Sequence, residues 1–211
     1  MVVADHQDRG RGSHGRTWSS PAGVDLYLSI VERITLPPAA SATVTLAVGL
    51  GVTDAITSLA PSLVSRVKVK WPNDAWIDRK KTAGVLVESS SSGATQGPII
   101  VGIGLGVNRV EWPEELVGQA TSLRDATSET FDRSRVLAVL LASVECAVDA
   151  LVRDGVAATV ARLETRLAMR GEDVRVDEER GRLIGLDGRG ALRLETSCGE
   201  RTMISGTLRP A

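Results

Sequence analysis

Alternating hydrophobic and polar positions predict several short strands in this chain. The predicted strands are Met1–Asp5, Leu26–Ile34, Arg66–Trp71, Ala75–Ile77, Ala83–Glu88 and Ile99–Val107. Polar, glycine-rich or proline-rich segments separate them. We expect Asp8–Ser20 and Ser89–Gly97 to be loops and Asn108–Thr130 to be irregular, because these segments lack a period of two or of 3.6 residues.

Three apolar stretches predict helices instead. Ala39–Leu59 is rich in alanine, leucine and valine and indicates a mostly buried helix. Arg135–Val152 and Val156–Ala168 are expected to be two helices with Gly155 between them. Cys146 falls in the first of this pair, and we expect it to be buried and inert.

The pattern of hydrophobic and polar residues changes near Gly171. Four or five short strands follow, separated by glycine or charged turns, which is typical of a small β-barrel. The pattern as a whole predicts an α+β fold with a mixed sheet flanked by helices. We expect a main domain over residues 1–169 and a small β-domain over residues 170–211.

Composition narrows the class of protein. The 211 residues include 25 Lys and Arg and 26 Asp and Glu, a net charge of −1, and 43% are hydrophobic. These values exclude wholesale disorder and a generally basic nucleic-acid binder. No apolar run reaches about 18 residues, so no membrane span is expected, and the polar start MVVADHQDRG does not resemble a secretory signal. Two widely spaced cysteines favour reduced thiols of the cytoplasm.

The lysines are concentrated in one short segment. The chain has 21 Arg but only four Lys, at positions 68, 70, 80 and 81. Residues 66–81 hold six Lys and Arg against two Asp, a local charge of +4. One explanation is a genome that favours arginine codons, together with chance. The other is that this segment needs an ammonium group as a compact point charge.

The first candidate for chemistry is the segment Gly10–Arg16. Gly10, Gly12 and Gly15 have the spacing of a dinucleotide-binding loop, but Pro21 blocks a following helix and no second βαβ unit is evident. That class of site is therefore disfavoured. Bare amides and guanidinium groups can still bind an anionic ligand such as a phosphate, and the alternative is a solvated surface loop.

The second candidate is the sequence KWPND with a lysine and a glycine soon after it. Lys70, Asn73 and Asp74 place a cation, an amide and a carboxylate at a strand end, and Lys81 and Gly84 follow. Such a set can hold a nucleotide phosphate and a metal ion together. The alternative is a hairpin with a charged turn.

The third candidate is a strand with glycine at every second position. Gly102, Gly104 and Gly106 remove the side chains from one face of the strand, so a flat ligand or another backbone can approach it. Close helix–sheet packing is the alternative. Asn108, at the strand end, either bonds a base edge or caps a turn.

Taken together and in this order, these segments resemble the biotin–protein ligase (biotin–[acetyl-CoA-carboxylase] ligase) family. The family pattern is Q-x-x-GRGRxGR-x-W-x-S-P-x-G, then KWPND, then K-x-x-G-x-L-x-E, then G-x-G-x-N. The matching positions are Gln7, Gly10–Arg16 except Ser13, Trp18, Ser20, Pro21, Gly23, Lys70–Asp74, Lys81, Gly84, Leu86, Glu88, Gly104, Gly106 and Asn108. The resemblance covers about residues 2 to 125. The predicted strands after residue 170 are also consistent with the small SH3-like domain found at the C-terminus of family members.

The resemblance implies a two-step ligase reaction. Biotin and ATP, with Mg²⁺, would form biotinyl-5′-AMP, and a lysine of a biotin carboxyl carrier protein domain would then take the biotin. Lys81 and Arg11 are the implied catalytic residues, and the glycine-lined strand would be a floor for the biotin ring. The implied contacts to biotin or its adenylate are Gln7, Gly10, Arg11, Gly12, Ser13, Lys81, Gly84 and Gly104. The implied ATP contacts are Lys70, Asn73, Asp74 and Asn108, with Asp74 also a magnesium ligand.

The resemblance also sets expectations about partners and departures. It implies a cytoplasmic enzyme, a homodimer, and no DNA or membrane partner. Ser13 stands where the family has arginine, so we expect the adenylate to be held less tightly. Met1 falls within what would be an interior strand, so an N-terminal segment that contacts biotin is expected to be absent. The alternative functions are a lipoate-type ligase or acyltransferase of the same fold, and an inactive adenylate-binding module.

Overall fold

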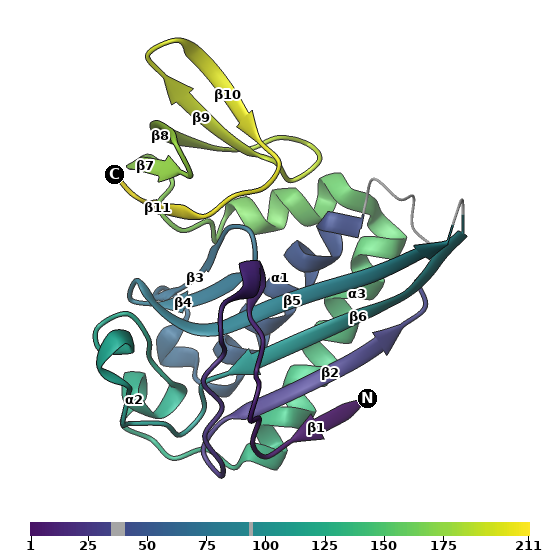
Figure 1. The fold of residues 1–211 in the computed structure, drawn as a ribbon, viewed down its shortest axis with the longest axis vertical. Coiled ribbons are helices and arrows are strands. Elements are labelled where there is room, and N and C mark those ends of the chain that lie inside the picture. Colours follow the sequence, from purple (N-terminus) through teal and green to yellow (C-terminus); the bar gives the residue numbers. More distant parts are fainter. Residues whose placement is uncertain (35–40, 93–94) are drawn as a thin grey trace.

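The computed structural model describes residues 1–34, 41–92 and 95–211. It has an α+β architecture, as predicted: a six-stranded sheet, two long helices on one face of it, and a separate five-stranded sheet near the C-terminus (Figure 1). The order of the larger sheet is β1-β2-β6-β5-β4-β3. Its strands are β1 (Val2–Ala4), β2 (Leu26–Glu32), β3 (Val67–Lys70), β4 (Asp74–Ile77), β5 (Lys80–Ser92) and β6 (Thr95–Leu105).

The predicted mixed sheet is wrong. Every pairing between these strands in the described residues is antiparallel. Parallel pairing is confined there to two isolated bridges, at residues 69 and 167 and at residues 81 and 120. The reason is that β3, β4, β5 and β6 follow one another through short hairpin connections, and such connections join antiparallel neighbours.

The helices follow the sequence pattern closely. They are α1 (Ser41–Leu59), the short α2 (Leu123–Thr127) and α3 (Arg133–Glu164). Gly155 interrupts α3 with φ 84° and ψ 177°, a combination that essentially only glycine adopts, so the two predicted helices are the two segments of α3. The second segment ends at Glu164 rather than at Ala168.

The predicted loop over Ser89–Gly97 is largely strand. Its described residues continue β5 and β6, with residues 91 and 96 and residues 92 and 95 facing each other in the ladder. Residues 93 and 94 lie outside the described part, as do residues 35–40. Backbone pairing at a hairpin end does not require apolar side chains, which is why composition was a poor guide here.

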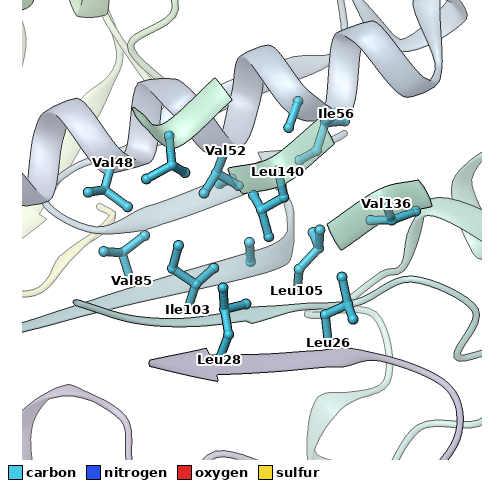
Figure 2. Close-up of a cluster of buried hydrophobic side chains, with 14 of the residues drawn as sticks. Leu26, Leu28, Val48, Val52, Ile56, Val85, Ile103, Leu105, Val136 and Leu140 are labelled. Atoms are coloured by element: carbon cyan, nitrogen blue, oxygen red, sulfur yellow. The ribbon is translucent and has the colours of Figure 1, made fainter. Parts of the chain in front are cut away.

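The main hydrophobic core lies between the larger sheet and the two long helices. Figure 2 shows Val48, Val52 and Ile56 of α1 above strand residues such as Val85 and Ile103. Val136 and Leu140 of α3 close the same cluster. Because strand side chains alternate between faces, burying this face on helices leaves the opposite face available for a site.

The C-terminal strands form an open sheet in order β10-β9-β8-β7-β11. They are β7 (Asp173–Val176), β8 (Glu179–Leu186), β9 (Leu192–Thr196), β10 (Gly199–Met203) and β11 (Leu208–Pro210). In the part of the chain that the structure describes, no pairing joins β10 to β11, so no closed barrel is found. Leu46 and Leu50 of α1 share a second hydrophobic cluster with this sheet.

Two further expectations meet the structure here. Cys146 is exposed, so its predicted burial is wrong. The reason is its place on α3, where Val144, Ala147 and Leu151 make the buried stripe and residue 146 faces away from it. Among the described residues, no helix is both long and apolar enough to cross a membrane.

Candidate active site

Residues 7–20 include the loop predicted over Asp8–Ser20, and backbone hydrogen bonds fold this loop into a hairpin, here called the lid hairpin. Its backbone bonds run from Gly12 N–H to the Arg16 carbonyl (2.7 Å) and from Trp18 N–H to the Gly10 carbonyl (2.9 Å). Gly10 is needed for this close approach, since a Cβ there would lie 2.4 Å from the Trp18 carbonyl oxygen. The lid hairpin crosses the face of the larger sheet that α1 and α3 leave uncovered (Figure 1).

A cavity of about 140 Å³ lies between the lid hairpin and the sheet. The predicted site residues that line it are Gln7, Arg11, Gly12, Ser13, Asn73, Lys81, Gly84 and Gly104. They come from positions almost one hundred residues apart. The register of β5 and β6 explains part of this convergence, because Gly84 and Gly104 are directly paired. Gly10, Lys70, Asp74 and Asn108 are not in the lining.

Lys81 contributes an ammonium group to the cavity. Its Nζ lies 2.6 Å from Asp74 Oδ1 and 5.1 Å from the centre of the Trp18 ring, and the side chain is 30% exposed. The contact with Asp74 is a close ion pair between an ammonium and a carboxylate. The ammonium is thus held by the Asp74 carboxylate and by the face of the Trp18 ring.

Lys70 and Asp74 lie next to the cavity and act on it through charge. Lys70 Nζ is 3.7 Å from Asp74 Oδ2 and 5.2 Å from the centre of the Trp76 ring. Burial lowers the pKa of Lys70; the nearby Asp74 opposes this shift, whereas Lys81, a like charge, adds to it. One carboxylate therefore stands between two ammonium groups, which leaves a net positive charge beside the cavity.

Trp18 covers part of the glycine floor, a contact that sequence reasoning missed. A Cβ on Gly104 would meet three indole atoms at 2.4–2.6 Å, and one on Gly84 would meet the ring at 2.9 Å. Gly102 is different, with its nearest neighbour at 3.5 Å. Of the three glycines predicted to leave one face of the strand bare, Gly104 packs against the indole, Gly106 lies against another backbone, with a Cβ there 2.8 Å from a carbonyl oxygen, and Gly102 is open.

The lid tip is held by weak contacts. Arg11 forms an ion pair with Glu88 at 3.1 Å, with side chains 72% and 45% exposed, and such surface pairs contribute about 0–1 kcal/mol. Arg16 folds back on Ser13, donating to its Oγ at 2.9 Å. His14 is exposed. These exposed side-chain contacts therefore contribute little to holding the tip in this position.

Two predicted ATP contacts use their amides within the protein. Asn108 Nδ2 donates to the Phe131 carbonyl at 2.8 Å, and Asn108 Oδ1 accepts from Phe131 N–H at 2.9 Å, which favours the turn-capping alternative. Asn73 Nδ2 donates to the Val85 carbonyl at 2.8 Å and braces β5 at the cavity wall. Asn108 as an adenine contact stays a prediction.

Tyr27 and Asp25 were not predicted as site residues. Tyr27 lines the cavity, and its buried hydroxyl donates to the Pro21 carbonyl at 2.9 Å and to Asp25 Oδ2 at 3.3 Å. Burial raises the pKa of both side chains. The sequence offered no motif for either residue beyond the fact that Tyr27 is the sole tyrosine. Their place at the cavity could be found only from the fold.

Comparison with known proteins gives the class. The family model for the biotin/lipoate A/B protein ligase family matches residues 1–108. The biotin–[acetyl-CoA-carboxylase] ligase of Paracoccus denitrificans is 32% identical over 215 residues, covering 96% of this chain and 86% of that protein. The biotin protein ligase of Aquifex aeolicus, solved in complex with biotin and ATP, superposes with a TM-score of 0.86 at 32% identity, covering 99% of this chain and 88% of that one.

This chain therefore belongs to the biotin/lipoate A/B protein ligase family, and within it to the biotin protein ligases. The bifunctional ligase/repressor BirA of Escherichia coli is 31% identical over 197 residues. That match covers 92% of this chain and 60% of BirA, so the chain spans about 60% of the length of this curated relative.

Proposed function

We propose that this chain is an ATP-dependent biotin–protein ligase of the cytoplasm. The observation that carries the proposal is the convergence of the Lys81 ammonium and the arginine-bearing lid hairpin on one cavity lined by Gly84, Gly102 and Gly104. The similarity to a ligase solved with biotin and ATP supports both substrates.

In the first step, an oxygen of the biotin carboxylate attacks the α-phosphorus of ATP, and the bond to pyrophosphate breaks. The products are biotinyl-5′-AMP and pyrophosphate. Two anions must meet in this step, and negative charge grows on the α-phosphate. Lys81 would sit beside both groups, and Arg11 would close over them, so the protein contributes position and positive charge.

In the second step, a lysine amine of a carboxyl carrier protein attacks the carbonyl carbon of the mixed anhydride. The amide bond forms, AMP leaves, and the amine loses a proton. The weak Arg11–Glu88 contact supports this step, because the lid must open for the carrier lysine to reach the intermediate.

The packing of the glycines under the cavity indicates where the biotin ring would lie. Trp18 covers Gly84 and Gly104, so we place the biotin ring system toward Gly102, with Gln7 beside it. The buried Trp18 Nε1 has no hydrogen-bond partner within the described residues and would be a donor for the ligand. Gly10 shapes the lid, and Gly12 and Ser13 line its inner side.

The nucleotide would lie toward Lys70 and Asn73. Asp74 does not fit a magnesium site built by the protein, because its carboxylate is flanked by two ammonium groups. No cluster of three or more His, Cys, Asp or Glu occurs in the described part of the chain. Magnesium commonly binds through nucleotide phosphates with few protein ligands.

Other expectations from the resemblance stay predictions. They are the two domains at 1–169 and 170–211, an SH3-like relationship for the C-terminal sheet, the homodimer, and the lack of a DNA partner. Residues of α1 and of the C-terminal sheet share one hydrophobic cluster. This supports a C-terminal sheet that folds together with the larger part of the chain rather than as an independent domain.

Biotin-dependent exchange of labelled pyrophosphate into ATP tests the proposal. We expect exchange with biotin and none with lipoate or without an acid. Exchange with lipoate alone would indicate a lipoate-type ligase instead. Binding of ATP with no exchange for either acid would indicate a non-catalytic module.

A further inference from the structure

Arg109 is a buried cation to which the proposed chemistry gives no task. It lies a few residues beyond β6 and is 7% exposed. A buried guanidinium is costly unless several partners satisfy it, so its contacts show what it holds.

The guanidinium of Arg109 holds the stem of the lid hairpin. It donates to Ser19 Oγ at 3.1 Å and to the Ser19 carbonyl at 3.5 Å. A third donor, Nε, bonds the Glu111 carbonyl at 3.0 Å, and the group stacks 4.5 Å from the centre of the Trp112 ring. Asp25 Oδ2, at 4.0 Å, supplies the balancing negative charge.

The backbone of Arg109 is tied to the segment that holds Lys81. Ser122 Oγ donates to the Arg109 carbonyl at 2.6 Å. Next to Ser122, Thr121 N–H donates to the Lys81 carbonyl at 2.9 Å, and Lys81 N–H donates to the Gln119 carbonyl at 2.8 Å. The strand position that carries the ammonium is thus clamped by the segment that Arg109 anchors.

These contacts form a closed loop that includes two residues of the cavity wall, Trp18 and Lys81. Ser19, which Arg109 holds, directly follows Trp18, and the Trp18 ring lies over the Lys81 ammonium at 5.1 Å. The lid and the catalytic lysine are therefore linked twice, once by the aromatic contact and once through Arg109.

We propose that Arg109 is a positioning residue that couples closure of the lid hairpin to the alignment of Lys81. The inference rests on the proposed function for its effect on catalysis. Arginine suits the task because its rigid fork reaches Ser19 and Glu111 together, which the single ammonium of a lysine cannot do. When the lid opens, the anchor of the Lys81 clamp loosens with it.

The test is Arg109→Lys, with the exposed Arg124→Lys as the matched control. Arg109→Lys keeps the charge opposite Asp25 and removes the fork. The first readout is trypsin cleavage in ligand-free protein after Arg9, Arg11 and Arg16, the arginines of the lid hairpin. Losing a charge-assisted hydrogen bond predicts cleavage about tenfold faster in Arg109→Lys and unchanged in Arg124→Lys.

The second readout is the kinetics of biotinyl-AMP formation. We expect kcat to fall about tenfold in Arg109→Lys while KM for ATP changes by less than about twofold, because alignment changes and nucleotide contacts do not. A rise in KM for ATP with kcat unchanged would overturn the proposal, since it would make Arg109 a nucleotide-binding residue.

Ser19→Ala tests the same contact without touching the buried charge. It should also speed cleavage of the lid, and its effect should nearly vanish in the Arg109→Lys background. Equal effects of Ser19→Ala in both backgrounds would contradict the coupling. Cleavage needs neither biotin nor ATP, so failure of the coupling and failure of the proposed function give different results.

Discussion

At the scale of single residues, Gly104 is the most tightly constrained floor position of the site. Its missing side chain leaves room for the Trp18 indole, whose atoms would lie 2.4–2.6 Å from a Cβ there. Gly102, one repeat along the same strand face, has no neighbour closer than 3.5 Å. Two glycines on the same strand face therefore have different packing.

We predict that Gly104→Ala destabilises the protein by about 1–3 kcal/mol through overpacking, whereas Gly102→Ala changes stability little. Urea unfolding followed by circular dichroism measures both. In a Trp18→Ala background the cost of Gly104→Ala should be largely removed. Equal stabilities of the two single glycine variants would contradict the packing of Trp18.

The lowered pKa of Lys70 predicts a pH dependence of ATP binding. Burial is the main cause of its lowered pKa, so it loses its proton at a lower pH than an exposed lysine. Under the proposed function this loss removes positive charge beside the phosphates. We therefore predict that KM for ATP rises as pH increases through the alkaline range.

Lys70→Arg tests this prediction because a guanidinium stays charged over that range. The rise in KM should move to higher pH in Lys70→Arg, and the exposed Lys80→Arg should behave like the parent. Identical alkaline profiles for the parent and Lys70→Arg would show that Lys70 does not control the effect.

At the scale of elements, periodicity predicted the strands and helices that bury one face. Leu26–Ile34 and Ile99–Val107 correspond to β2 and β6, and Ala39–Leu59 corresponds to α1 over its described part. Periodicity missed the pairing of elements. The lid hairpin is held by backbone bonds between Gly10 and Trp18 and between Gly12 and Arg16, which leave no hydrophobic repeat in the sequence.

Site residues that belong to a sequence motif could be predicted. Site residues that are brought in only by tertiary contacts could not. Lys81, Gly84 and Gly104 were found because they fall in sequence motifs, K-x-x-G and G-x-G-x-N, that resemble those of a known family. Arg109 and Tyr27 were missed because their partners, Ser19 and Asp25 among them, are chosen by the fold. The antiparallel pairing of the sheet was likewise missed, because it depends on the short connections between strands and not on their composition.

At the scale of the whole molecule, the two sheets share hydrophobic packing. Trp71, at the end of β3, donates from Nε1 to the Gly190 carbonyl at 3.0 Å, and both lie in buried surroundings. Leu46 of α1 packs so closely there that a Cβ on Gly190 would lie 2.4 Å from its methyl group. The C-terminal sheet therefore relies on the larger part for its core.

We predict a single cooperative unfolding transition for the whole chain, with coincident circular dichroism and fluorescence curves. Trp71→Phe should lower the stability of this single transition by about 1–3 kcal/mol, because the buried Gly190 carbonyl loses its donor. A separate, earlier transition of residues 170–211 in the parent protein would contradict this prediction.

The most direct test of the account is single-turnover formation of biotinyl-AMP by the parent, Lys81→Ala and Lys80→Ala. Lys80 is the exposed neighbour of Lys81 and is the matched control. If the Lys81 ammonium aligns and neutralises the reacting anions, Lys81→Ala should slow the step at least about 100-fold, and Lys80→Ala should match the parent. Equal rates for Lys81→Ala and the parent would contradict the central claim.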